Sequence, residues 1–259
     1  MLVDSHCHLD RLKLDKYDNG LDDAVNAARE RGVTHMLCVC ISEENKQAVL
    51  DIAQRYPDIS ASVGVHPSDV KADVVSEAEL TAWASEDKVV AIGETGLDYF
   101  HSDEFAQQQH ESFANHLRVA GKFGLPVIVH TRNARDDTIA LIKAHGNVGS
   151  AGVLHCFTET WEMAEQALDL GYYISLSGIV TFKNATELKE VAKRVPAERL
   201  LVETDSPYLA PVPYRGKPNE PKFVREVAEY VAELRGMSYD ALAQQTGENF
   251  FRLFSKAKA

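Results

Sequence analysis

Eight short runs rich in apolar and β-branched residues recur along this chain of 259 residues. They comprise residues 2–6, 34–41, 60–65, 89–93, 126–130, 152–155, 172–176 and 200–203. The segments between and after them carry apolar residues at helical spacing, namely residues 21–31, 42–56, 76–85, 105–123, 136–145, 161–170, 184–194, 221–235 and 239–254. Alternating strands and helices predict β–α–β units with a parallel sheet. Eight repeats in about 250 residues predict a single (β/α)8 TIM barrel across residues 1–259.

An open, doubly wound sheet fits the chain less well. Such sheets usually carry a glycine-rich phosphate loop after the first strand. Here the first run leads into His6, Cys7 and His8, and neither Gly-x-Gly-x-x-Gly nor Gly-x-x-x-x-Gly-Lys occurs in the sequence. One loop, residues 210–221, is rich in proline, glycine and basic residues. It is typical of a rigid connector, but its place on the functional rim of a barrel also makes it a candidate contact.

The overall charge limits the partners that the chain can bind. Asp and Glu number 39 against 27 Lys and Arg, which gives a formal net charge of -12. This balance disfavours a broad grip on a nucleic-acid backbone, which depends on many basic contacts. It does not exclude a small phosphoester substrate, because cations bound at the site would supply positive charge.

The sequence predicts neither a membrane span nor a secretory signal. The longest apolar stretches end far short of the roughly 18 residues of a membrane helix, and the N-terminus has no basic region. The four cysteines include no Cys-x-x-Cys pair. We therefore expect a cytoplasmic protein without membrane association, and nothing indicates an obligatory protein partner.

Residues that can bind metals fall at the ends of the predicted strands. They are His6 and His8 after the first strand, His66 after the third, Glu94 and Asp98 after the fourth, His130 and His155 after the fifth and sixth, and Glu203 and Asp205 after the eighth. The carboxyl ends of barrel strands meet at one rim, so these side chains are expected to face a common point. The other histidines, at positions 35, 101, 110, 116 and 145, are interpreted as packing or surface residues.

Each of these residues alone has an ordinary structural explanation. A His-x-His pair or a histidine that ends an apolar run can be a satisfied core residue, and Arg132 can form a salt bridge at a helix start as readily as it binds an anionic substrate. Taken together, six possible ligands at equivalent strand ends match a site for two cations. They are His6, His8, Glu94, His130, His155 and Asp205. Such a pair of cations turns water into a nucleophile near neutral pH.

Several motifs across nearly the whole chain strengthen this interpretation. They include Asp4-Ser5-His6-Cys7-His8, Val63-Gly64-Val65-His66-Pro67, Gly93-Glu94-Thr95-Gly96-Leu97-Asp98-Tyr99, His130-Thr131-Arg132, His155-Cys156-Phe157-Thr158, the stretch from Glu203 to Pro211, and Asn219-Glu220-Pro221. With these motifs the chain resembles the TatD-family metal-dependent hydrolases, amidohydrolase-like barrels that include deoxyribonucleases. One departure is Glu159, where the family commonly has glycine; it leaves every expected ligand in place.

The resemblance implies a role for each residue at the rim. His6, His8, Glu94 and Asp205 would bind one divalent ion, and Glu94, His130 and His155 a second, with Glu94 as the bridge. Asp205 is the expected general base, His66 and Arg132 the expected substrate contacts, and Asp98 and Glu203 the residues that orient ligands. Zn, Mg and Mn all suit such mixed ligands.

The resemblance also implies a reaction. We expect phosphodiester hydrolysis of DNA, as in a 3′–5′ exonuclease, with nucleic-acid strand ends as the substrate. One alternative is an amidohydrolase acting on a small ester or C–N bond, but such enzymes often bridge their metals with a carboxylated lysine where this chain has Glu94. A second alternative is a catalytically idle binding barrel, which the intact set of ligands disfavours.

Overall fold

A computed structural model describes residues 1–100 and 104–258. Eight strands form one sheet, in which neighbouring strands along the chain pair in parallel from the first to the eighth. They are β1 (Leu2–Cys7), β2 (Val33–Cys38), β3 (Ile59–Val63), β4 (Val89–Asp98), β5 (Val127–Arg132), β6 (Gly152–Leu154), β7 (Tyr173–Leu176) and β8 (Leu200–Val202). A parallel bridge between Cys7 and Ser206 joins the two edges of the sheet. The predicted (β/α)8 barrel is therefore confirmed.

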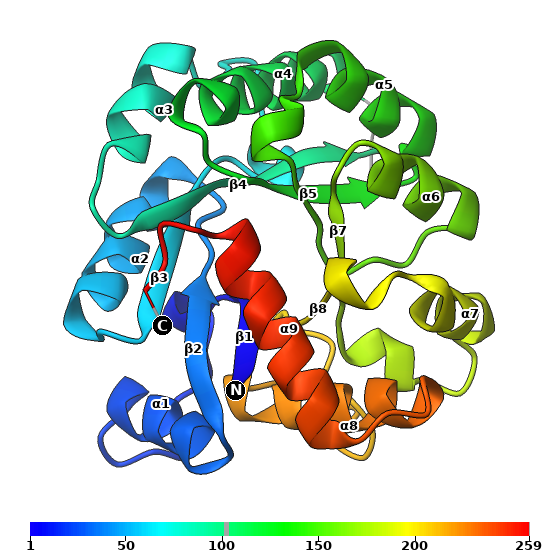
Figure 1. Cartoon of the computed structure of the whole chain (residues 1–259). Coiled ribbons are helices and arrows are strands. Elements are labelled where there is room, and N and C mark those ends of the chain that lie inside the picture. Colours follow the sequence, from blue (N-terminus) through cyan, green and yellow to red (C-terminus); the bar gives the residue numbers. More distant parts are fainter. Residues whose placement is uncertain (101–103, 259) are drawn as a thin grey trace.

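The helices surround the strands in chain order (Figure 1). They are α1 (Leu21–Glu30), α2 (Glu43–Arg55), α3 (Glu77–Ala84), α4 (Ala106–Phe123), α5 (Arg135–His145), α6 (Trp161–Asp169), α7 (Thr186–Arg194), α8 (Val224–Leu234) and α9 (Tyr239–Leu253). The side chains of Ser42 and Ser76 cap α2 and α3, each accepting a backbone N–H from the helix's third residue.

Several sequence-based boundaries differ from the structure by a few residues, and two of these differences have a clear physical reason. The helix predicted for residues 221–235 begins as a separate 3-10 turn, Pro221–Phe223, before α8, because the turn starts at a proline that fixes its own backbone and lacks an N–H. Strand β4 continues to Asp98, beyond the predicted end at residue 93, because Gly96 and Leu97 still pair with β5. The longer strand carries Glu94 and Asp98 inside the sheet.

The barrel has two apolar layers. The outer layer lies between the strands and the surrounding helices. The inner layer fills the barrel and consists of residues from the strands, with Phe250 and Phe254 from the C-terminal end of the chain. Helix α9 contacts β1 and β8 and runs across them in Figure 1. The C-terminal helix thus seals one end of the barrel, and the carboxyl ends of the strands open at the other.

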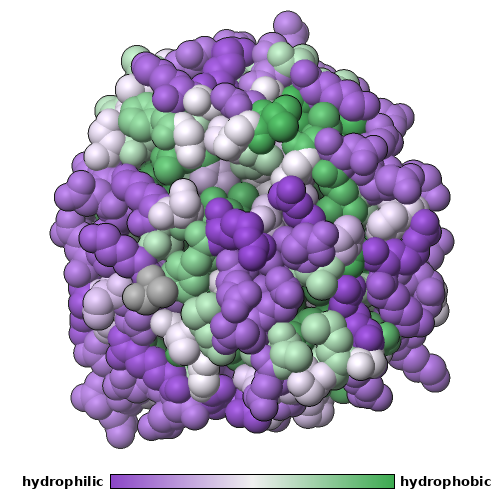
Figure 2. Space-filling model, in the orientation of Figure 1, coloured by the Kyte–Doolittle hydropathy of each residue, from purple (hydrophilic) through white to green (hydrophobic). Residues whose placement is uncertain are grey.

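The surface on the α9 side is mainly hydrophilic, and apolar side chains show there only in separated groups (Figure 2). Among the described residues, no helix has the length and apolar character needed to cross a membrane.

Close backbone approaches shape the mouth of the barrel beside Glu94. A Cβ atom added at Gly64 would lie 2.5 Å from the Cα of Gly93, and one added at Gly96 would lie 2.0 Å from the carbonyl oxygen of His130. The close approach of β3 to β4 therefore requires glycine at position 64, and the approach of β4 to β5 requires glycine at position 96, two residues after Glu94. The register of β4 against β5 also shifts between Ile92 and Thr95. Such an irregularity re-aims a side chain, here that of Glu94.

The position of Phe254 in the barrel interior predicts a large stability loss on truncation. Phe254 is fully buried, so Phe254→Ala should lower the free energy of unfolding by about 3–5 kcal/mol. The matched control is Phe123→Ala, at a ring that is 36% exposed at the end of α4. Denaturant unfolding of both variants measures the difference, and equal losses would contradict the sealing role of the C-terminal end.

Candidate metal centre

Four donor atoms converge from the carboxyl ends of β1 and β8 and from the middle of β4. His6 Nε2 lies 3.3 Å from His8 Nε2 and 3.3 Å from Glu94 Oε2. Asp205 Oδ1 lies 3.3 Å from His8 Nε2 and 3.6 Å from His6 Nε2. Donors about 2.1 Å from one cation at tetrahedral angles lie about 3.4 Å apart. The spacing of this first donor group, His6, His8, Glu94 and Asp205, therefore suits a single small cation.

The hydrogen bonds of His8 show why this group attracts a cation. His8 Nδ1 lies 3.2 Å from the Val39 carbonyl oxygen, which can only accept, so the neutral ring carries its proton on Nδ1. The Nε2 lone pair then faces the oxygen of Asp205 and the Nε2 of His6. Acceptors that face one another while buried need a positive charge between them, which a proton on His8 or a divalent cation can provide.

Both carboxylates of this group are ionised. Burial by itself raises the pKa of Glu94, but the charge on His155 and the hydrogen bond with His130 outweigh it and hold that pKa well below its usual range. Burial also opposes ionisation of Asp205, and the neighbouring imidazoles of His8 and His6 lower its pKa nonetheless. The centre is therefore a buried region of negative charge surrounded by imidazoles.

A second donor group forms around the other oxygen of Glu94. His155 Nε2 lies 2.7 Å and His130 Nδ1 3.3 Å from Glu94 Oε1. Burial opposes a charge on His155, yet Glu94 and Glu203 raise the pKa of its imidazole well above the usual range. The position between His155 and Glu94 thus favours positive charge, which a proton or a divalent cation can provide. Glu94 belongs to both donor groups, one oxygen to each.

Carboxylates hold the far nitrogens of the second group. Asp98 Oδ2 accepts from His130 Nε2 at 2.9 Å, and Glu203 Oε1 accepts from His155 Nδ1 at 3.3 Å. Each bond places the ring proton on the side away from Glu94 and leaves the near nitrogen free to donate its lone pair.

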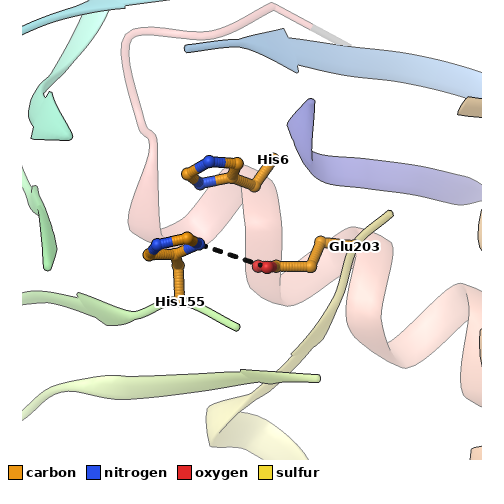
Figure 3. Close-up of side chains that lie close together, drawn as sticks. All are labelled: His6, His155 and Glu203. Atoms are coloured by element: carbon orange, nitrogen blue, oxygen red, sulfur yellow. Dashed lines mark hydrogen bonds and ion pairs between the residues drawn. The ribbon is translucent and has the colours of Figure 1, made fainter. Parts of the chain in front are cut away.

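Glu203 lies beneath both donor groups. The rings of His6 and His155 stack with centroids 3.9 Å apart and planes 8° apart, and Glu203 points toward them from the end of β8 (Figure 3). Its Oε1 also accepts the Cys156 backbone N–H at 2.8 Å. Among the described residues, His6 Nδ1 and Glu203 Oε2 are buried without a hydrogen-bond partner. When His6 binds a cation through Nε2, its Nδ1 carries the ring proton and is a hydrogen-bond donor, whereas Glu203 Oε2 is an acceptor.

His66 reaches the same carboxylate with the opposite tautomer. The Ser68 backbone N–H donates to His66 Nδ1 at 3.0 Å, so the neutral ring carries its proton on Nε2. That nitrogen lies 3.4 Å from Glu94 Oε1. Burial lowers the pKa of His66 to about 3, so the neutral form prevails. By distance His66 could complete a metal site, but its tautomer makes Nε2 a donor of a hydrogen bond rather than a lone pair.

The remaining sequence-predicted residues occupy the rim. The Arg132 guanidinium lies over the Phe100 ring, with Cζ 3.5 Å from the centroid. Glu159, at the position where the family commonly has glycine, pairs with Arg135 at the start of α5. Of the histidines interpreted as packing residues, His35 and His116 are fully buried, and residue 101 lies outside the described residues.

Three supporting residues received no role from the sequence. Asp4 is buried and accepts the Thr204 backbone N–H at 2.8 Å, one residue before Asp205. Asn219 donates to the Thr204 carbonyl at 2.8 Å. His116 Nε2 accepts the Val65 N–H at 3.0 Å, beside His66. Asp4 and Asn219 lie in motifs that the sequence analysis quotes, and those motifs could have indicated their importance. No motif indicates His116, because it lies on a helix distant in sequence from the loop that it supports.

Comparison with known proteins agrees with this geometry. A family model described as TatD related DNase matches residues 3–255. The chain belongs to this family. As a TatD-family protein it is a metal-dependent hydrolase, and its fold matches the crystal structure of the TatD homologue YJJV from Escherichia coli K12. The TM-score is 0.89 at 30% identity, over 98% of each chain.

Two relatives of this TatD-family chain bear on its activity. It is 48% identical over 253 residues to the uncharacterized metal-dependent hydrolase YcfH of Escherichia coli K12, covering 98% of this chain and 95% of the relative. It is 35% identical over 247 residues to a protein of Cronobacter sakazakii named 3′-5′ ssDNA/RNA exonuclease TatD, covering 93% and 94% of the two chains.

The contacts of Glu203 predict an effect on metal affinity. Glu203→Gln keeps the size of the side chain but weakens its hold on the Nδ1 proton of His155, so divalent-metal affinity should fall about 10- to 100-fold. Glu165→Gln, at an exposed residue of α6, is the control. Calorimetric titration of metal-free protein with Zn or Mn measures both, and unchanged affinity in Glu203→Gln would rule out the orienting role.

Proposed function

We propose that this protein is a divalent-metal-dependent deoxyribonuclease that removes nucleotides from a strand end in the 3′–5′ direction. The observation that carries the proposal is the pair of donor groups sharing Glu94, in which the side chains of Asp205 and His130 remain 13% and 20% exposed. The Cronobacter relative named as a single-strand exonuclease supports the choice of substrate. The four cysteines, all free, fit a reducing cytoplasm as the place of action.

The two donor groups have separate tasks in this proposal. His6, His8, Glu94 and Asp205 would hold one divalent ion, and Glu94, His130 and His155 would hold the other. Zn, Mg and Mn are all compatible with these imidazole and carboxylate ligands. When bound, the ions supply Lewis acidity that lowers the pKa of water and offsets negative charge on the phosphate.

Asp205 is the general base. Its Oδ1 faces His6 and His8, and the side chain remains 13% exposed at the mouth. A carboxylate has a second oxygen, which can accept the proton of an attacking water. The lowered pKa of Asp205 keeps this acceptor ionised at neutral pH.

His66 stabilises the charge that develops on the phosphate or on the leaving oxygen. Its Nε2 proton is fixed by the Ser68 N–H on the opposite nitrogen, so the ring can donate without first being protonated. The ring packs edge-on against His130, with centroids 4.4 Å apart, and this contact holds it beside the second donor group. Arg132 adds a cation at the end of β5, where it contacts the substrate strand.

Cleavage of end-labelled oligonucleotides tests the proposed activity. Metal-free protein should be inactive on single-stranded DNA, and Mg, Mn or Zn should restore stepwise shortening from the 3′ end. Strands labelled at the 5′ end reveal the ladder of products, and duplex DNA serves as the comparison. Absence of cleavage after metal loading, with metal binding demonstrated, would overturn the assignment.

Replacement of the base gives a second test. Asp205→Asn removes an ionised oxygen at the first donor group, so turnover should fall at least about 100-fold while the fold is retained. Initial rates at saturating metal and circular dichroism measure the two properties. Near-normal turnover would exclude Asp205 as the base.

Substitutions of His66 and His130 should affect different properties, kcat for His66 and metal affinity for His130. His66→Gln should lower kcat about 100-fold with metal affinity unchanged, because Nε2–H of His66 donates a hydrogen bond and provides no lone pair to a metal. His130→Gln should weaken metal binding, because it loses a lone pair aimed at Glu94. Metal titrations and rates on the same oligonucleotide compare the variants, and weakened metal binding in His66→Gln would make it a ligand instead.

A further inference from the structure

Exposed apolar side chains gather at the mouth of the barrel. Three of the six large exposed ones among the described residues, Phe100, Tyr208 and Val212, follow β4 or β8. Tyr208 is the one nearest the metal centre in sequence, three residues after Asp205, and its ring centroid lies 6.1 Å from that of His8. The ring is edge-on to His8, at 67°, and the residue is 49% exposed. An uncovered aromatic surface therefore borders the first donor group.

The exposure of Tyr208 is imposed by its loop. The Tyr208 N–H donates to the Asp205 carbonyl at 2.9 Å, and the Tyr208 carbonyl accepts from Asn219 Nδ2 at 2.6 Å. Asn219 is fully buried and also donates to the Thr204 carbonyl. Tyr208 thus has a backbone fixed on both sides while its ring faces solvent. A rigid, exposed aromatic side chain is a preorganised contact for a ligand.

The surrounding loop is positively charged. Residues 206–219 contain Arg215 and Lys217 and no Asp or Glu. The Arg215 guanidinium lies over the Phe182 ring, with Cζ 4.1 Å from the centroid. The Val212 N–H donates to Thr181 Oγ1 at 2.9 Å, which holds this loop against the segment that leads to Phe182. Aromatic faces combined with cations are the features by which proteins bind unpaired nucleic-acid strands.

We propose that an unpaired nucleobase beside the scissile phosphodiester stacks on the ring of Tyr208, with Arg215 against the strand's phosphates. The inference rests on the proposed nuclease function and specifies how that site selects its substrate. A base inside a duplex has both faces covered by its neighbours and cannot use the platform. Tyr208 therefore selects for strands whose end is already unpaired, in a protein whose net charge of -12 opposes a long electrostatic track.

Base-dependent cleavage tests this inference. The substrates are a single-stranded oligodeoxynucleotide and two versions that are abasic at one or the other nucleotide flanking the scissile bond. The variants are Tyr208→Ala and Tyr208→Phe, with Val212→Ala as the control because Val212 is an equally exposed apolar residue of the same loop, at 47%. Rates are measured with metal-saturated protein, and kcat and KM are determined separately.

The expected result is specific to the base. Wild-type protein, Tyr208→Phe and Val212→Ala should cleave the normal strand about tenfold more efficiently than one of the abasic strands, and this ratio should fall toward one in Tyr208→Ala. The loss should appear mainly in KM, and Tyr208→Ala should match wild-type protein on that abasic strand.

Other outcomes overturn the inference in distinguishable ways. Equal losses of Tyr208→Ala on normal and abasic strands would assign the ring to support of the metal ligands. A retained preference for the base in Tyr208→Ala would place the base elsewhere. If metal-loaded wild-type protein cleaves no oligonucleotide, the proposed function itself fails, and this inference with it.

Discussion

The convergence of imidazoles on the buried carboxylate of Glu94 is the interaction on which the rest of the mouth depends. Each Glu94 oxygen serves a different donor group, so a displacement of this one side chain would disturb both. The carboxylate is 4% exposed and stays ionised because histidines surround it. Its position follows from glycines that let β3 and β5 approach β4 closely. Backbone sterics and electrostatics are thus coupled at a single residue.

Control of tautomers is the second principle of the centre. The proton of a neutral imidazole sits on the nitrogen that faces an acceptor, and the protein supplies a different neighbour for each ring. Carbonyl or carboxylate oxygens hold His8, His130 and His155 with their lone pairs inward, whereas a backbone N–H holds His66 with its proton inward. The hydrogen-bond partners thereby make His8, His130 and His155 electron-pair donors and make His66 a hydrogen-bond donor.

Much of this arrangement could be predicted from the sequence. The strand and helix periodicities specify a barrel, and the barrel places His6, Glu94, His130 and the other strand-end residues at one rim. The tautomers could not be predicted, because they depend on contacts such as Ser68 with His66 that follow from local backbone geometry. The seal formed by Phe250 and Phe254 was also invisible, since a helical period does not indicate which cavity the helix fills.

The connection between the first and last strands has a consequence for synthesis of the chain. Asp205 N–H donates to the His6 carbonyl at 2.9 Å, and the first donor group combines residues separated by almost the whole barrel sequence. Phe250 and Phe254 then complete the interior from the final helix and its end. A growing chain therefore has neither the complete first donor group nor the closed barrel until β8 and α9 have been made. The donor group can form only after the barrel closes.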